Sequence, residues 1–375
     1  MKSYKGHPKG ISSPILAEVS YNKSFFNRYG KIYVSQEASS CPMGFSGLIT
    51  GNGLSKECSK PTVVLDKNII NEISEGTFVT LNQDGTVSVV WDYKSSSNTI
   101  FPTPACDCRC VMCPQPPTYD DGTSFNFAMK LLDRLDPSKV TKICVTGGEP
   151  TLLGDKFIEL MKKIKRRFDH AFVMLLTNGK NFSNYALAKE YAAIGLSNSI
   201  TCFSLHSDLE ELNDYIAGSK GSFHKTVQGL YNFARLSQKV EIRHVICKDN
   251  SLRLEEFAHF VHRNFPFAFH VAFMGMEFVG HALDNFNDLW IDIFKRRKHI
   301  NRAVSTLHRA NVSVSVYNIP LCLLDPNTWP FARQSISDWK NSYLHECIGC
   351  KQQSNCCGFF TTSYDKVSPN IKKIL

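Results

Sequence analysis

The segment of the sequence with the richest potential chemistry is Cys106-Asp-Cys-Arg-Cys-Val-Met-Cys113. Cys106, Cys110 and Cys113 have the spacing C-x3-C-x2-C, so three thiolates in one short loop can point at one centre. Four-thiolate iron–sulfur sites normally leave no iron open. Three thiolates on a four-iron cluster leave one iron free, by the same logic as a catalytic zinc with an unfilled position. A small chelating ligand can then bind the free iron.

A second motif, Gly147-Gly-Glu-Pro150, ends an apolar strand-like run downstream. The cysteine loop followed by a strand with this ending resembles the radical S-adenosylmethionine (SAM) superfamily. In that family the open iron of a [4Fe-4S] cluster binds the SAM methionine group. The reduced cluster cleaves SAM to a 5′-deoxyadenosyl radical, which abstracts hydrogen from the substrate. The resemblance implies that this chain binds and orients the same two cofactors.

Two other interpretations of the central loop must be weighed. Three close cysteines can bind zinc instead of a cluster. A disulfide framework is the weaker alternative, because the sequence begins without the apolar core of a secretory signal. Cys108 lies between the predicted ligands but does not fit the family spacing, so we interpret it as a non-ligand.

The overall composition is that of an ordinary globular protein, with 375 residues, 43% of them hydrophobic and 21% charged. The apolar runs are too short to span a membrane, and we expect a cytoplasmic protein with no membrane partner. The net charge is +9, but the basic runs 162–167 and 295–299 lie in helical patterns, which predicts solvated helix faces. We therefore expect no nucleic-acid partner.

Fourteen cysteines favour metal or redox chemistry. Cys144, Cys202 and Cys247 lie in apolar runs, where buried inert thiols are expected. A second cluster near the C-terminus resembles the auxiliary-cluster tails (SPASM or twitch) of peptide-modifying radical SAM enzymes, although Phe360 stands where a further cysteine is expected. The predicted ligands of this auxiliary iron–sulfur cluster, or of zinc, are Cys322, Cys347, Cys350 and Cys356, with Cys357 as a competitor for the last place.

The sequence predicts that residues 1–97 form a β-rich accessory domain, which contains a hairpin around Asn82-Gln-Asp-Gly85. This domain could hold a leader peptide by strand addition or serve as a structural cap. The segment 94–98 reads as a connector.

From residue 98, apolar strands alternate with amphipathic helices, which predicts an α/β fold with a parallel sheet. The predicted strands are 99–104, 142–146, 172–177, 199–205, 241–247 and 269–275. Six such units fit a partial (β/α)6 barrel over 98–285, as the family resemblance implies. Residues 286–375 then form a C-terminal extension, with a long helix over 289–310 and a seventh strand or an edge at 312–316.

Barrel sites lie at the carboxyl ends of the strands, and here all six ends carry special residues. Mapped onto them, the resemblance implies SAM-binding roles for Met112, Gly147, Gly148, Glu149, Ser204, Arg243 and Met274. The glycines would expose backbone to the SAM methionine group, and Met112 would lie near the adenine. Glu149 can instead be structural. His206 is the alternative to Ser204 near the ribose, and a structural ion pair is the alternative role for Arg243.

A finer resemblance rests on Cys110-Val-Met-Cys-Pro-Gln-Pro-Pro117, Phe273-Met-Gly-Met-Glu277, Ile319-Pro-Leu-Cys322 and Cys356-Cys-Gly-Phe-Phe360. These stretches are similar to the C-type radical SAM maturase of His-Xaa-Ser peptide systems. The implied function is modification of a ribosomally made precursor peptide. The implied partners are that peptide, a second radical SAM maturase and a one-electron reductant of the flavodoxin or ferredoxin type. Two rival hypotheses are a radical SAM enzyme acting on a small molecule or nucleoside, and a non-catalytic zinc scaffold. No catalytic side chain can be named.

Overall fold

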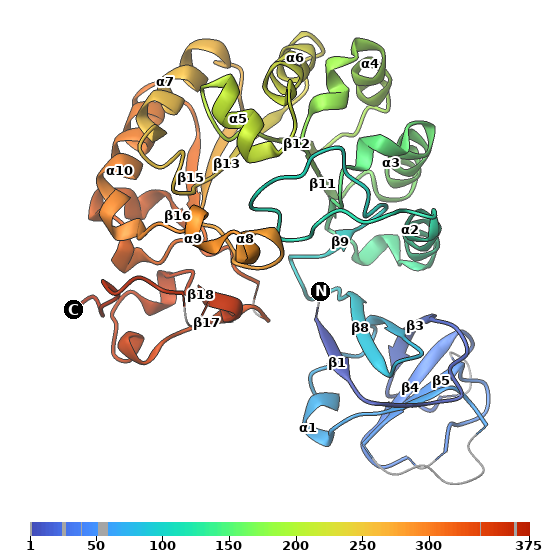
Figure 1. The fold of residues 1–375 in the computed structure, drawn as a ribbon. Coiled ribbons are helices and arrows are strands. Elements are labelled where there is room, and N and C mark those ends of the chain that lie inside the picture. Colours follow the sequence, from blue (N-terminus) through green and yellow to red (C-terminus); the bar gives the residue numbers. More distant parts are fainter. Residues whose placement is uncertain (1, 25–27, 39, 52–58, 338, 364–365) are drawn as a thin grey trace. The chain divides into compact units, whose positions relative to one another are not determined.

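The computed structural model describes the chain except for residues 1, 25–27, 39, 52–58, 338 and 364–365 (Figure 1). The chain forms two compact units, which are described separately below. The first contains Met1–Thr99 and Arg134–Lys142, and the second contains Ile100–Asp133 and Ile143–Leu375. The sequence suggests a further boundary near residue 286, but 98–285 and 286–375 both fall essentially in the second unit. That three-domain division stays a prediction.

The first unit is β-rich, as expected. Its described residues build one eight-stranded sheet in the order β1-β8-β7-β3-β4-β5-β6-β2. The elements are β1 (Ser3–Lys5), β2 (His7–Lys9), β3 (Ile15–Ser20), β4 (Lys31–Ser35), β5 (Gly47–Thr50), β6 (Thr62–Val64), α1 (Lys67–Ile70), β7 (Phe78–Leu81) and β8 (Thr86–Trp91). Strands β7 and β8 form the predicted antiparallel hairpin. The sequence also predicts strands at 31–35 and 62–65, where β4 and β6 lie, but it does not predict β1, β2, β3 or β5.

The sheet of the first unit is curved, and its two edges come together. Its two edge strands, β1 and β2, are consecutive in the chain and separated only by Gly6, whose amide donates to Gly85 O at 3.1 Å. The enclosed core includes Val19, Ile32 and Ile49, all fully buried. Each edge strand is only three residues long. Such short edges offer little backbone to a peptide that would bind by strand addition.

The second unit is an α/β structure whose strands lie in chain order. Its described residues form an eight-stranded sheet, β9 through β16 in sequence, and the pairs from β11 to β16 are parallel. The strands are β9 (Thr99–Ile100), β10 (Lys142–Val145), β11 (Phe172–Thr177), β12 (Ser199–Ser204), β13 (Val240–Val245), β14 (His270–Met274), β15 (Val314–Tyr317) and β16 (Ala332–Arg333). The predicted parallel α/β fold is therefore confirmed.

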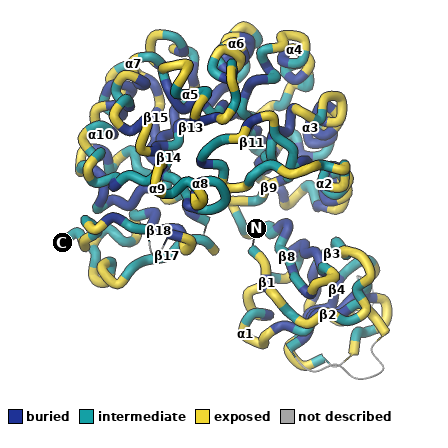
Figure 2. The backbone as a smooth tube through the Cα atoms, viewed as in Figure 1, coloured by how far each residue is buried: buried dark blue, intermediate teal, exposed yellow. Residues whose placement is uncertain are grey.

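Helices form an arc outside this sheet (Figure 1). They are α2 (Thr123–Arg134), α3 (Asp155–Phe168), α4 (Tyr185–Ala193), α5 (Glu210–Ala217), α6 (Ser222–Arg235), α7 (Leu254–Asn264), α8 (His281–Asp284), α9 (Phe286–Leu289) and α10 (Ile293–Arg309). Figure 2 shows the strands largely buried and the outer helix faces exposed. That pattern follows from amphipathic helices that bury one apolar face.

The structure differs from the expected elements at three places. The first strand covers only Thr99–Ile100 instead of 99–104, because Pro102 and Pro104 have no amide to donate to a ladder. The expected seventh strand is β15, which pairs with β14, and β16 extends the sheet further. The long helix α10 begins at Ile293 instead of at residue 289. Asp292 caps its N-terminus by accepting a hydrogen bond from the amide of Phe294.

The C-terminal residues form an irregular tail beyond β16. Its regular structure, within the described residues, is the two-stranded pair β17 (Asn341–Ser342) and β18 (Phe359–Phe360) together with short 3-10 turns. Lys340 Nζ lies 2.9 and 2.8 Å from the two carboxylate oxygens of Glu277, just beyond β14. This ion pair ties the tail to the sheet. Among the described helices, none combines the length and the hydropathy that crossing a membrane requires.

Candidate functional site

The cysteine loop follows β9 and is held by backbone contacts to the end of α5. The amides of Arg109 and Val111 donate to Ala217 O at 3.1 Å and Ile216 O at 3.0 Å. Gly218 caps α5 with a φ of 57°, and a Cβ built there would lie 2.1 Å from Arg109 O. A side chain at this position would push the loop away from the helix, so glycine is needed.

Gly147 and Gly148 lie against the chain that leads into the loop. Gly148 N donates to Thr103 O at 2.8 Å, and Glu149 N donates to Ala105 O at 2.7 Å. A Cβ added at Gly148 would lie 2.0 Å from Ala105 O, and one at Gly147 would lie 2.5 Å from Thr103 O. Both glycines are therefore required by close backbone packing, a reason that the sequence does not reveal. Their predicted contact with SAM stays a prediction.

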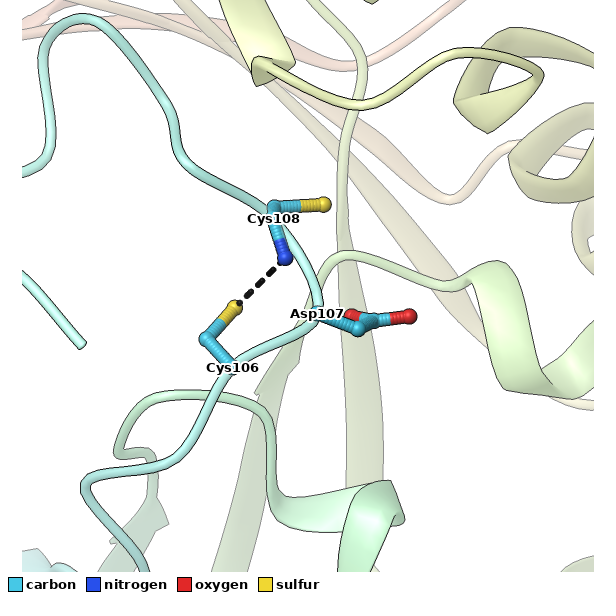
Figure 3. Close-up of side chains that lie close together, drawn as sticks. All are labelled: Cys106, Asp107 and Cys108. Atoms are coloured by element: carbon cyan, nitrogen blue, oxygen red, sulfur yellow. Dashed lines mark hydrogen bonds between the residues drawn. The ribbon is translucent and has the colours of Figure 1, made fainter. Parts of the chain in front are cut away.

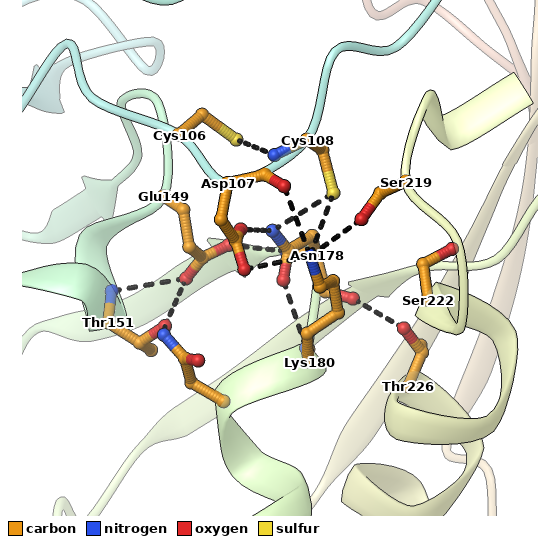
Figure 4. A network of polar contacts seen from close by, with 12 residues as sticks. Cys106, Asp107, Cys108, Glu149, Thr151, Asn178, Lys180, Ser219, Ser222 and Thr226 are labelled. Atoms are coloured by element: carbon orange, nitrogen blue, oxygen red, sulfur yellow. Dashed lines mark hydrogen bonds and ion pairs between the residues drawn. The ribbon is translucent and has the colours of Figure 1, made fainter. Parts of the chain in front are cut away.

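Glu149 links the ends of β10 and β11. Its Oε1 accepts from Thr151 N at 3.1 Å, from Thr151 Oγ1 at 2.6 Å and from Thr177 Oγ1 at 2.8 Å, and its Oε2 accepts from Asn178 N at 2.6 Å (Figure 4). The side chain is completely buried, and burial raises its pKa despite these bonds. Such a satisfied carboxylate favours the structural role left open above.

Cys106, Asp107 and Cys108 bring three ligand atoms within 4.8 Å of one another (Figure 3). The amide of Cys108 donates to Cys106 Sγ at 3.4 Å. The Cys106 thiol lowers the pKa of Cys108, whereas Cys110 and burial raise it, and the net value is about 12. The fourth thiol of the loop is thus close to two of the predicted ligands.

The thiols of Cys106, Cys110 and Cys113 are suitable for an iron–sulfur cluster. All three are free and partly buried. Burial raises the pKa of Cys113, and the nearby Cys106 thiol adds to this rise, so the first and third thiols of the motif also interact. An amide directed at Cys106 Sγ is the kind of hydrogen bond that stabilises a ligating thiolate.

The remaining predicted SAM contacts lie near the ends of neighbouring strands. Ser204 is directly opposite Arg243 in the β12–β13 pair, and Met274 is opposite Val245 in the β13–β14 pair. Met112 is buried in an apolar group with Ile216, Cys247, Phe278, Ala282 and Leu289. The structure therefore places Ser204 opposite Arg243 and buries Met112 in an apolar group against which Val245 also packs. Their SAM-binding roles stay predictions.

Arg243 already has a counter-charge. Its Nε lies 2.6 Å from Glu241 Oε1, and Glu241 Oε2 lies 2.8 Å from His270 Nδ1. Burial raises the pKa of Glu241, but His270 and Arg243 outweigh it and lower the value to about 2. The structural ion pair, weighed above as the alternative, is thus present. Its signal in the sequence is that Glu241 and Arg243 share one face of a strand.

The four predicted tail ligands line one small cavity. Cys322, Cys347, Cys350 and Cys356 surround it together with Tyr343 and Phe359. Cys356 Sγ accepts from Leu321 N at 3.4 Å and from Gly358 N at 3.5 Å, and Cys350 Sγ accepts from Ile374 N at 3.4 Å. Four thiols around one cavity, two of them with amides directed at their sulfurs, fit an auxiliary cluster.

Cys356 and Cys357 differ in their surroundings. A hydrogen bond from Cys357 lowers the pKa of Cys356 to about 6, with help from the Gly358 and Leu321 amides. Cys357 is 4% exposed and packs with Ile336 and Phe360. These environments favour Cys356 as the ligand, and the choice stays a prediction.

Comparisons with known proteins place this site in a family. The sequence model of the radical SAM superfamily matches residues 100–261. No curated protein sequence matches the chain.

Three solved structures show weaker likeness. Streptococcus suis SuiB bound to S-adenosylmethionine has 16% identity and a TM-score of 0.48 over 58% of this chain and 49% of SuiB. The protein anSMEcpe with bound AdoMet and a Cp18Cys peptide has 16% identity and a TM-score of 0.45 over 58% and 62% of the two chains. A radical SAM methyltransferase from Sphaerobacter thermophilus has 13% identity and a TM-score of 0.40 over 64% and 72%. This chain thus spans about half the length of SuiB.

The sequence match carries the assignment. It contains both the cysteine loop and the Gly147–Pro150 turn, and a domain of this family holds a [4Fe-4S] cluster and SAM. The cysteine-rich tail fits an auxiliary cluster in addition. Residues 100–261 therefore form a radical SAM domain.

Proposed function

We propose that this protein modifies a ribosomally synthesised precursor peptide, as a maturase of the His-Xaa-Ser type. The observation that carries the proposal is an apolar cavity beyond the carboxyl ends of β14 and β15. Met276, Phe278 and Trp290 line it from the sheet side, and Phe359 and Phe360 line it from the tail. A concave apolar pocket with a few polar groups is the usual form of a binding site.

The residues that this cavity shares with the surroundings of the two cysteine sites support a role in substrate binding. Phe278 and Leu289 also pack against Met112, which precedes Cys113 in the loop. Pro320 and Phe359 also line the cavity that holds the tail cysteines. A side chain bound here would therefore contact residues that also line the tail-cysteine cavity and residues of the apolar group that contains Met112.

A polar group in the cavity wall supports the same role. Ser363 is 8% exposed, and its hydroxyl has no hydrogen-bond partner among the described residues. A buried hydroxyl without a partner costs free energy unless a ligand satisfies it. We expect an apolar side chain with one polar end, presented by a peptide, to fill the cavity and bond Ser363.

Cys106, Cys110 and Cys113 would hold the cluster, and with SAM bound and one electron from an external reductant of the flavodoxin or ferredoxin type, these cofactors would supply reductive SAM cleavage and hydrogen-atom abstraction from a substrate C–H bond. The protein holds the cluster loop through its backbone bonds to Ala217 and Ile216. The apolar group around Met112 excludes water beside the loop.

The test is an anaerobic assay with SAM, dithionite and a synthetic peptide containing His-Xaa-Ser repeats. We expect 5′-deoxyadenosine to form, a changed peptide mass, and deuterium transfer from labelled peptide into 5′-deoxyadenosine. The Cys106/Cys110/Cys113→Ala variant is the control and should give none of these products. SAM cleavage without any change in the peptide, even with a second maturase present, would contradict the peptide proposal and favour a small-molecule or nucleoside substrate.

A matched pair of variants then tests the cavity itself. Ser363→Ala removes the unpartnered hydroxyl, and we expect a higher peptide KM with unchanged SAM binding. Ser354→Ala, at an exposed position of the tail outside the cavity lining, is the control. Equal peptide KM values for Ser363→Ala and wild type would exclude the hydroxyl as a substrate contact.

A further inference from the structure

The central loop contains one thiol more than the cluster needs, and the structure holds that thiol in place. Cys108 is 2% exposed, and its sulfur accepts from Asn178 Nδ2 at 3.5 Å and from Lys180 Nζ at 3.8 Å (Figure 4). Asn178 and Lys180 follow β11, about seventy residues along the chain. We call these two residues the clamp.

The two clamp residues also bind Asp107, the residue that precedes Cys108. Lys180 Nζ lies 2.8 Å from Asp107 Oδ2 and donates to Asp107 O at 3.1 Å, and Asn178 Nδ2 donates to Asp107 Oδ1 at 2.7 Å. Lys180 is only 6% exposed and also donates to Ser219 Oγ at 2.8 Å. A lysine buried to this degree is held by its partners, because an unpaired ammonium would be too costly.

The clamp is itself firmly anchored. Asn178 O accepts from Thr226 Oγ1 at 2.9 Å, and the Asn178 amide donates to the buried Glu149 carboxylate. The clamp is therefore bonded to residues outside the loop as well as to the loop. Within the loop its contacts are to Asp107 and Cys108, the two residues that immediately follow the predicted ligand Cys106.

Cys108 could otherwise compete for iron. Its thiol interacts with those of both Cys106 and Cys110, two of the predicted ligands. A fourth thiolate would complete the closed four-cysteine ligand set of an ordinary iron–sulfur site. That set leaves no iron open for SAM.

We propose that Lys180 and Asn178 select the ligands of the cluster: by holding Cys108 they reserve the metal for Cys106, Cys110 and Cys113 and keep the SAM-binding position open. The ammonium of Lys180 also opposes a single metal ion at the close group of Cys106, Asp107 and Cys108. The inference rests on the radical SAM assignment, and the two clamp residues act as positioning residues.

The experiment compares four reconstituted proteins: wild type, Cys108→Ala, Lys180→Met and the double variant Lys180→Met/Cys108→Ala. Iron is counted per chain, SAM affinity is measured by equilibrium dialysis, and the EPR spectrum of the reduced cluster is recorded with and without SAM. Lys180→Met keeps the apolar stem of lysine and removes the charge.

We expect Lys180→Met to keep its iron but to bind SAM about tenfold more weakly or worse, with an EPR spectrum that no longer changes on adding SAM. The Cys108→Ala variant should bind SAM as wild type does. The double variant should recover SAM binding and the EPR change, because the competing thiol is gone. A merely structural lysine would not show this rescue.

Two results would overturn the inference while leaving the proposed function intact: Lys180→Met that binds SAM like wild type, or single and double variants that are equally impaired. If Lys180→Met does not fold, Asn178→Ala with and without Cys108→Ala gives the same comparison in a milder form. A wild-type protein that takes up no iron would instead overturn the proposed function together with this inference.

Discussion

The two cysteine sites of the second unit are held in different ways. The central loop is fixed by two buried side chains that follow the ends of β10 and β11, Glu149 and Lys180, and by the end of α5. The tail cysteines come from irregular segments and 3-10 turns, and their sulfurs are contacted mainly by backbone amides. The protein therefore forms the first site by itself, whereas we expect the second site to depend on its metal for rigidity.

The largest expected effect is on the central site. Glu149→Ala removes one carboxylate that four donors share, and leaves those donors buried without a partner. We expect a loss of about 3 kcal/mol or more in unfolding free energy, measured by urea denaturation. Glu149→Gln keeps one acceptor oxygen and should lose less. Equal stability of the alanine variant and wild type would show that this carboxylate does not support the site.

The next effect concerns the close backbone packing at Gly148. An alanine Cβ would lie 2.0 Å from Ala105 O, so Gly148→Ala must displace the chain leading into the loop. We expect a loss of about 2 kcal/mol and loss of iron from the central site only. Gly195→Ala is the control, because its φ of 66° brings strain while no atom lies within 4 Å. If both variants keep all their iron, the packing argument fails.

A third prediction addresses the tail. Cys356→Ala should remove the tail metal and make the segment after β16 more sensitive to proteolysis, while the central cluster stays. Cys357→Ala should keep that metal and cost about 1 kcal/mol, because it leaves a small cavity beside Ile336 and Phe360. Metal loss in the Cys357 variant alone would reverse the ligand assignment.

The smallest effect is an acid sensitivity of the sheet below the central loop. Burial lowers the pKa of His244 to about 3 and that of His206 to about 4. Both values lie below the ordinary 6.5, so the unfolded chain binds more protons. The stability contribution is therefore complete above pH 6.5 and falls as the pH drops toward 4. His244→Phe should flatten this dependence in thermal unfolding at pH 4 to 7, and an unchanged slope would contradict it.

The sequence predicts the regular parts of this molecule better than its long-range contacts. Alternating apolar strands and helices were enough to predict the parallel sheet from Lys142 to Met274. Local patterns could not show that Gly6 joins the two edges of the first sheet, since closure depends on strands far apart in the chain.

The same limit applies to the site. The C-x3-C-x2-C spacing indicated a three-thiolate loop, because its ligands are close in sequence. Lys180 follows Asn178-Gly179 and looks like an ordinary turn lysine, yet it is buried against Asp107. The sequence singles out Arg243 as a charged residue within an apolar strand. Its ion-pair partner in the structure is Glu241, two residues earlier. Glu241 could be found from its spacing along the strand, whereas the partners of Lys180 are tertiary neighbours that spacing alone does not identify.

The central claim is that the two cysteine sites hold separate metal centres, one of them the SAM cluster. The most direct measurement is the iron and zinc content of anaerobically purified wild type and of two variants, Cys106/Cys110/Cys113→Ala and Cys322/Cys347/Cys350/Cys356→Ala. We expect about eight irons per chain in wild type and about four in each variant. About four irons and one zinc in wild type would make the tail site a zinc site. No iron in any of the proteins after reconstitution would contradict the account.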